Sequence, residues 1–313
     1  MRGKEATVKA LRIVGITLSL AGLAFFIAAV ARSPEVLFRA ATAPFFWTSL
    51  LIGAAAIFCS LLLAALNWHM LLGVFGVGRP LGLIGPVFLS TQIGKYLPGN
   101  VGHLVGRAVV LKSYDIPVSA STKAMIVEAI ALLCVGFALV AVLLREWLMQ
   151  ALKISEVSTW LVVGLLSIVV VAAAAALVFR DRIAPFIRQL LADLAASRKR
   201  LLAVGTIDLV NFGLNGLALW SSSVLLFPDK PIGMLACLGV ASASFLAGYI
   251  TPGSPGGIGV REATTVLLLY PTFSVTEAAT IALLLRLAAT LADLMGFVLG
   301  IALLALRRTG SVS

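Results

Sequence analysis

Two matching stretches interrupt an otherwise apolar chain: GKYLPGNVGHLVGR, from Gly94 to Arg107, and GYITPGSPGGIGVR, from Gly248 to Arg261. At a constant, gapless offset of 154 positions (248 minus 94), they share five identities in fourteen positions. Average composition would give about one or two identities. Pro117 and Pro271 match at the same offset, and each comes just before a predicted helix. A duplicated unit explains these matches.

The composition around the two stretches is that of a membrane protein. Of 313 residues, 61% are hydrophobic and 12% are charged, and the mean hydropathy is +1.09. A soluble domain carries about a quarter charged residues. We therefore expect an all-α polytopic membrane protein, with residues 1–313 forming a single membrane domain.

Six apolar segments are long enough to cross a bilayer, which takes about 20 residues. They are 13–31, 45–66, 118–144, 158–179, 201–226 and 277–306. The first segment follows a basic start that resembles a signal peptide, but it is too long for a signal core. We expect it to be a retained helix.

Two more apolar regions, 80–111 and 232–270, contain the Pro-Gly stretches and are predicted as broken helical hairpins, either re-entrant or fully spanning. With the N-terminus in the cytoplasm, this topology places fifteen Lys and Arg residues inside and five outside. Such an excess follows the positive-inside rule. The basic loop 180–200 carries six of the fifteen. We expect a bacterial-type inner membrane protein with both termini in the cytoplasm.

Three predicted crossings separate the two hairpins, so the first opens toward the cytoplasm and the second opens away from it. Repeat cores at about 80–144 and 232–306 are then inverted repeats. Transporters built in this way bind their cargo near the midplane, where broken helices meet. The fold prediction is therefore about six transmembrane helices plus two inverted hairpins.

The breaks have the chemistry of an anion site. Pro and Gly end one helix, and the next helix begins with unpaired N–H groups and a positive dipole end. Arginine binds a phosphate bidentately. The residues predicted to bind substrate are Lys95, Tyr96, Pro98, Gly99, Asn100, Gly102, His103, Arg107, Pro252, Gly253, Ser254, Gly256, Gly257, Arg261 and Glu262.

Structural alternatives stay open for several of these residues. Glycines also permit close helix packing, and an arginine near a helix end can extend its charge to the interface. Arg107 fits this second description as well as it fits a binding role. His103 could contact a headgroup, but capping of the turn is the interpretation that we favour.

A second set of polar residues lies inside predicted helices, where ionisable groups usually have a function. They could line the route, carry protons or neutralise the arginines. For Arg286 and Asp293, an ion pair that is direct or made through another helix is at least as well supported as a transport role. The set is Glu128, Asp208, Asn211, Asn215, Arg286 and Asp293.

The motifs GKYLPGNVGHLVGR and PGSPGGIGVREA, with the helices around them, resemble the flippase-like membrane region of lysylphosphatidylglycerol synthases. The resemblance covers about residues 10–306 and includes stand-alone proteins built from that region alone. It implies movement of a lipid across the bilayer. In bifunctional members the lipid is an aminoacylated phospholipid, which a separate soluble domain makes. Because the sequence ends at Ser313, we expect no lipid synthesis here, and the cargo stays open.

The leading hypothesis is a flippase or scramblase for an anionic phospholipid or a polyprenyl- or hopanoid-type lipid. The alternatives are a proton-coupled transporter of a small anion and a membrane enzyme acting on lipid-linked substrates. No HExxH, G-x-S-x-G or clustered Cys and His motif is present, so we expect no enzyme activity, metal or cofactor. The expected partners are membrane lipids, because anionic headgroups account for the net charge of +11 without nucleic acid. A homo-oligomer and a partner enzyme that makes the lipid are also compatible with the sequence.

Overall fold

The computed structural model describes residues 42, 45–97, 101–147, 180–230, 232–251 and 254–310. Within these ranges the secondary structure is helical, and no strand is present. The predicted segments 13–31 and 158–179 lie outside the described residues, as do Pro98, Gly99, Asn100, Pro252 and Gly253 at the centres of the two breaks. The prediction of an all-α polytopic membrane protein is confirmed.

Four long helices match predicted crossings. They are α3 (Phe46–Val74), α6 (Val118–Leu143), α10 (Arg198–Leu226) and α13 (Val275–Gly310), and each contains a stretch long and apolar enough to span a membrane. Helix α3 continues eight residues beyond the predicted end at residue 66, because no proline interrupts it before the turn at Gly76, whose φ is +79°. Helix α3 packs against α10 and α13.

Both interrupted regions are broken hairpins. The first consists of α4 (Leu81–Thr91), the short 3₁₀ helix η1 (Gln92–Tyr96) and α5 (Gly102–Lys112), and the second of α11 (Met234–Ile250), η2 (Pro255–Gly257) and α12 (Val260–Leu269). An arm of 10 or 11 residues, as in α12 or α5, is about 15 Å long, which is half of the hydrocarbon core. The arms α5 and α12 are therefore too short to cross the membrane, whereas α11, with 17 residues, is about 25 Å long.

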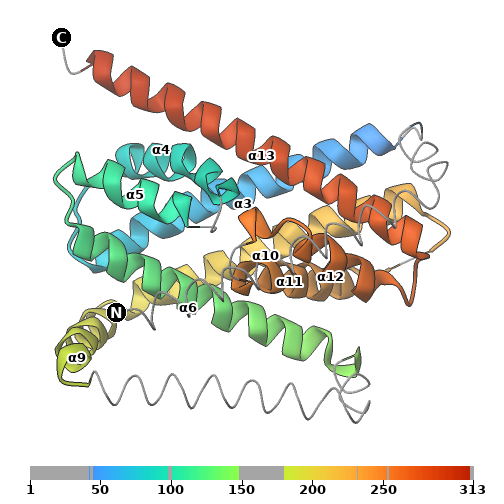
Figure 1. The fold of residues 1–313 in the computed structure, drawn as a ribbon, viewed down its shortest axis with the longest axis horizontal. Coiled ribbons are helices and arrows are strands. Elements are labelled where there is room, and N and C mark those ends of the chain that lie inside the picture. The colour runs from blue at the N-terminus through green and yellow to red at the C-terminus, as the bar shows by residue number, and fades with distance from the viewer. Residues whose placement is uncertain are drawn as a thin grey trace, which may run out of the picture.

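The two hairpins enter the bundle from opposite ends, and their tips meet in the middle (Figure 1). Helices α4 and α5 occupy one end of the view and α11 and α12 the other, with α13 crossing both. Tip contact is close: a Cβ added at Gly256 of η2 would lie 3.0 Å from the ring of Tyr96 in η1. This is the arrangement that inverted repeats predict.

Each hairpin helps to form its own hydrophobic core. The first core includes Trp68, Phe88 and Leu111, and the second includes Leu269 and Phe273. Because the apolar packing is divided in this way, the region between the two tips is free to hold polar groups.

Basic residues gather at the end of the bundle where the first hairpin opens. There Arg200 donates to the carbonyl oxygen of Gly73 (2.5 Å), and Lys123 of α6 pairs with Asp193 (3.2 Å). Asp193 belongs to α9 (Arg180–Ala196), so the predicted basic loop 180–200 is largely helical. Its buried Leu190 joins the first core, which explains why this segment folds against the bundle.

Candidate functional site

A cavity of about 500 Å³ lies where the two hairpin tips meet, bordered by α3, α6, α10 and α13. This volume falls within the range of small-molecule sites. Helices and breaks that are far apart in sequence supply its polar wall. Ten of the described residues that were predicted to bind the substrate or to line its route border this cavity: Lys95, His103, Arg107, Glu128, Asp208, Asn211, Asn215, Gly256, Arg261 and Asp293.

The other described candidates do not border this cavity. Tyr96, Gly102, Ser254, Gly257, Glu262 and Arg286 instead build the breaks or support them. Ser254, for example, is fully buried and donates to the carbonyl oxygen of Ile258 (3.2 Å). At Gly102 an added Cβ would lie 2.4 Å from the carbonyl oxygen of Gly94, so only glycine permits this approach of two backbones. Glu262 and Arg286 border a smaller pocket beside Arg261, and a binding role for the six residues stays a prediction.

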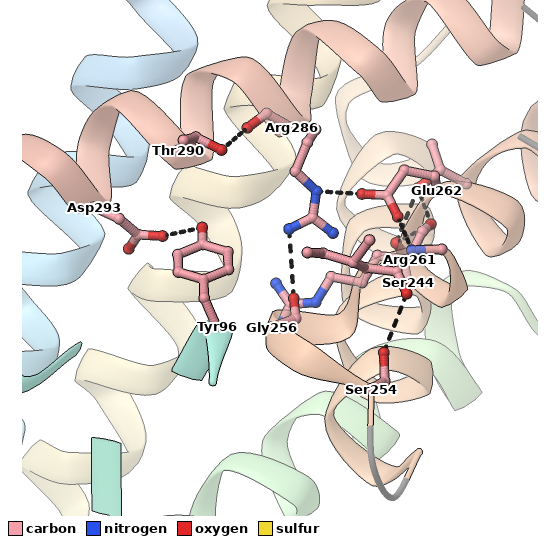
Figure 2. A network of polar contacts seen from close by, with 12 residues as sticks. Tyr96, Ser244, Ser254, Gly256, Arg261, Glu262, Arg286, Thr290 and Asp293 are labelled. Atoms are coloured by element: carbon pink, nitrogen blue, oxygen red, sulfur yellow. Dashed lines mark hydrogen bonds and ion pairs between the residues drawn. The ribbon is translucent and has the colours of Figure 1, made fainter. Parts of the chain in front are cut away.

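The first break is fastened to α13 by Asp293. Lys95 Nζ donates to one carboxylate oxygen of Asp293 (2.7 Å), and the Tyr96 hydroxyl donates to the other (2.6 Å; Figure 2). Asp293 is only 4% exposed. Lys95, predicted as an anion-binding cation, is therefore already neutralised by a carboxylate.

Arg107 is also paired with a carboxylate. Its guanidinium pairs with Glu128 of α6 (3.1 Å), donates to Gln92 Oε1 (2.7 Å) and lies 3.8 Å from the ring centroid of Phe88. The residue is 2% exposed, so its side chain does not extend to the interface. The interfacial alternative for Arg107 is wrong, because α5 directs this side chain into the bundle, where it contacts Glu128 and Gln92.

The second break is fastened to the same helix, α13, by Arg286. Glu262 accepts a hydrogen bond from the backbone N–H of Gly259 (2.7 Å), which caps α12, and its other oxygen pairs with Arg286. Arg286 also reaches the carbonyl oxygen of Gly256 (3.4 Å; Figure 2). Arg286 and Asp293 thus make their ion pairs through other elements, as one of the predicted alternatives has it, and not with each other.

Arg261 differs from the other cations at the breaks in having no ion-pair partner among the residues that the structure describes. Within the described part of the chain its guanidinium has no carboxylate partner, whereas Lys95, Arg107 and Arg286 each have one. The buried Nε of Arg261, like that of Arg107, has no hydrogen-bond partner in this part of the chain. The guanidinium lies 4.4 Å from the ring centroid of Phe245. Added Cβ atoms at Gly248 and Gly257 would come within 2.5 and 2.6 Å of this side chain, so the two glycines form the slot that holds it.

Asp208 differs from the other carboxylates that border the cavity in having no ion-pair partner within the described ranges. It is 4% exposed and accepts one hydrogen bond from Asn67 Nδ2 (2.8 Å), while its other oxygen has no partner. Asn215, farther along the same face of α10, donates to the carbonyl oxygen of Asn211 (2.8 Å). No ion pair of Asp208 is present among the described residues.

Sequence reasoning missed Asn67, Gln92 and Phe245. The two amides carry a recognisable signal, because each is a polar side chain within a long apolar stretch. Phe245 carries none, since one aromatic residue in an apolar helix resembles any other.

Comparison with known proteins gives one family. The model of the lysylphosphatidylglycerol synthase TM region matches residues 12–296, which is most of the chain and includes both hairpins. No curated protein and no solved structure matches the chain. On the strength of that match, and of a helical bundle with two broken hairpins, this chain belongs to the family of lysylphosphatidylglycerol synthase transmembrane regions.

Proposed function

We propose that the protein is a lipid transporter of the flippase or scramblase type, which binds an anionic headgroup between its two hairpin tips. Membership of a family of lipid-related membrane regions supports a lipid as cargo. Arg261 carries the proposal: among the lining cations of the described structure it is the one without an ion-pair partner, while Lys95 and Arg107 are paired.

A phosphate suits the environment of Arg261. A buried guanidinium without a counter-ion is costly in a membrane, and a bound phosphate would supply the missing charge and accept two parallel hydrogen bonds. The Arg261 guanidinium lies over the ring of Phe245. This contact and the glycine slot would hold the side chain ready for the anion.

Room for acyl chains favours a lipid over a small soluble anion. Val101 borders the cavity and is also 52% exposed, so the cavity reaches the outside of the bundle beside α5. Val105 and Val109, four and eight residues farther along, continue this exposed apolar face. A headgroup in the cavity could therefore keep its tails in the bilayer.

We further propose that the basic end of the bundle, with Arg200 and α9, faces the cytoplasm of a bacterial-type inner membrane, following the positive-inside rule. The lipid would come from a separate enzyme, because no catalytic motif was found in the sequence.

Reconstitution into liposomes tests the proposal. Protein-containing vesicles should exchange fluorescent phosphatidylglycerol, or a polyprenyl phosphate, between leaflets faster than protein-free vesicles. Arg261→Gln should lower this rate about tenfold to a hundredfold, because hydrogen bonds to charged groups contribute about 1.5–3 kcal/mol. Arg198→Gln, which removes an exposed arginine, is the matched control and should leave the rate unchanged.

Two results would contradict the proposal. One is exchange no faster than in protein-free vesicles for every anionic lipid tried. The other is full activity of Arg261→Gln. Uptake of inorganic phosphate without lipid exchange would instead support the small-anion transporter.

A further inference from the structure

The charges around the cavity do not all pair off. Its described lining holds three cations, Lys95, Arg107 and Arg261, and three carboxylates, Glu128, Asp208 and Asp293. Two ion pairs, Lys95 with Asp293 and Arg107 with Glu128, use two of each. Arg261 and Asp208 remain, so the cavity has one unneutralised group of each sign.

Around Asp208, oxygen atoms lack donors. Three buried side-chain oxygens have no hydrogen-bond partner: Oδ2 of Asp208, Oδ1 of Asn67 and Oδ1 of Asn211. Asp208 and Asn67 are nine-tenths buried or more and are held together by a hydrogen bond. Asn211 lies one turn from Asp208 on the same face of α10. Buried acceptors without donors are costly, so this group is incomplete as it stands.

The count of acceptors indicates what is missing. A proton on Asp208 would supply one donor and leave at least one of the asparagine oxygens unsatisfied. A cation that bonds in several directions could satisfy all three. One positive charge would balance the one carboxylate. Both a sodium ion, which prefers oxygen ligands, and a primary ammonium, with three N–H donors, have these properties.

We propose that Asp208 and Asn211, which border the same cavity as Arg261, form a binding site for a monovalent cation together with Asn67, which donates to Asp208. The cation is a sodium ion or the primary ammonium of a headgroup. Binding at this site does not depend on the proposed function, whereas its coupling to an anion does. An anion at Arg261 would leave the cavity with one excess negative charge, so it would strengthen cation binding at Asp208, and the reverse holds by linkage.

Thermal unfolding of the purified full chain tests the free ion. In sodium chloride, compared with choline chloride at equal ionic strength, the wild-type Tm should rise by roughly 2–4 °C. Asp208→Asn should lose this rise. Its Tm without sodium should equal or exceed that of the wild type, because the new amide gives an N–H donor to the neighbouring oxygens. Asp229→Asn, which removes an exposed carboxylate, should keep the full sodium response.

Liposome exchange tests the headgroup ammonium. Phosphatidylethanolamine and phosphatidylglycerol differ in having or lacking a primary amine. If the ammonium binds, Asp208→Asn should slow exchange of phosphatidylethanolamine about tenfold more than it changes exchange of phosphatidylglycerol. Asn211→Leu removes one oxygen without touching the Asp208–Asn67 bond and should weaken whichever response is found.

A sodium response that Asp208→Asn abolishes supports the free ion, and an amine-specific loss of exchange supports the headgroup. The proposal is overturned if neither occurs, if Asp208→Asn keeps the sodium response, or if stability depends on pH but not on sodium. Failure of the lipid-transport proposal is separate, because it appears as absent phosphatidylglycerol exchange while the sodium response of the purified protein is intact.

Discussion

Arg107 and Arg261 stand at matching positions of the two repeats, yet their surroundings differ. Arg107 has Glu128 and Gln92 as partners, whereas Arg261 has only the face of Phe245 and the walls of a glycine slot. At the offset of 154 positions, Ala282 stands where Glu128 does, and Leu246 where Gln92 does. The two arginines occupy equivalent positions but have different partners, and Arg261 is the one that we propose binds the anion.

For the ion pairs that hold the breaks to α13, it is the second repeat that has both partners and the first that lacks them. Glu262 and Arg286 pair within the second repeat, but their counterparts at the same offset are Ala108 and Leu132. The first break is instead fastened from the other repeat, by Asp293. The two halves are therefore similar in backbone and different in the charges that hold them.

The largest effect should come from removing the partner of Arg107. Glu128→Ala leaves a buried guanidinium without its carboxylate and should lower the free energy of unfolding by about 3–5 kcal/mol. Denaturation in detergent, followed by circular dichroism, measures this change. Glu146→Ala removes an exposed acid from the end of the same helical stretch and should change the stability by less than about 0.5 kcal/mol. Equal stability of the two variants would mean that Arg107 is not held as the structure indicates.

Giving Arg261 a carboxylate partner, as Arg107 has in Glu128, should have an intermediate effect, which we expect on lipid exchange. Ala282 borders a small pocket of about 80 Å³ that Arg261 also borders. A carboxylate in Ala282→Glu should neutralise Arg261 and lower lipid exchange about tenfold or more. Ala282→Gln has nearly the same volume without the charge and separates neutralisation from crowding. Activity lost equally in both variants would indicate crowding and would leave the role of Arg261 unsupported.

The smallest effect concerns the contact between the tips. Gly256 has φ +58°, and a Cβ there would press on the ring of Tyr96, so Gly256→Ala should cost about 1–3 kcal/mol in unfolding free energy. Gly205→Ala is the matched control, because nothing lies within 4 Å of the added Cβ in helix α10. That variant should gain about 0.5–1 kcal/mol. A neutral Gly256→Ala would mean that the tips do not touch.

The sequence was sufficient to predict the hairpins, because helix-breaking residues within apolar segments leave few arrangements of the backbone. Their inverted sense followed from counting crossings and charges. Which cation stays free could not be predicted in this way, since it depends on side chains from other helices. Lys95 and Asp293 are 198 positions apart, and no local pattern joins them. A comparison of the repeats beyond the motifs, at Glu128 and Ala282, would have distinguished the two arginines.

One rod-like element connects the two halves mechanically. Arg286 and Asp293 are seven residues apart on α13, or about 10 Å along its axis, and each fastens a different hairpin. If α13 rotates or tilts, both fastenings shift in the same movement. The position of one hairpin tip is therefore coupled to that of the other through α13.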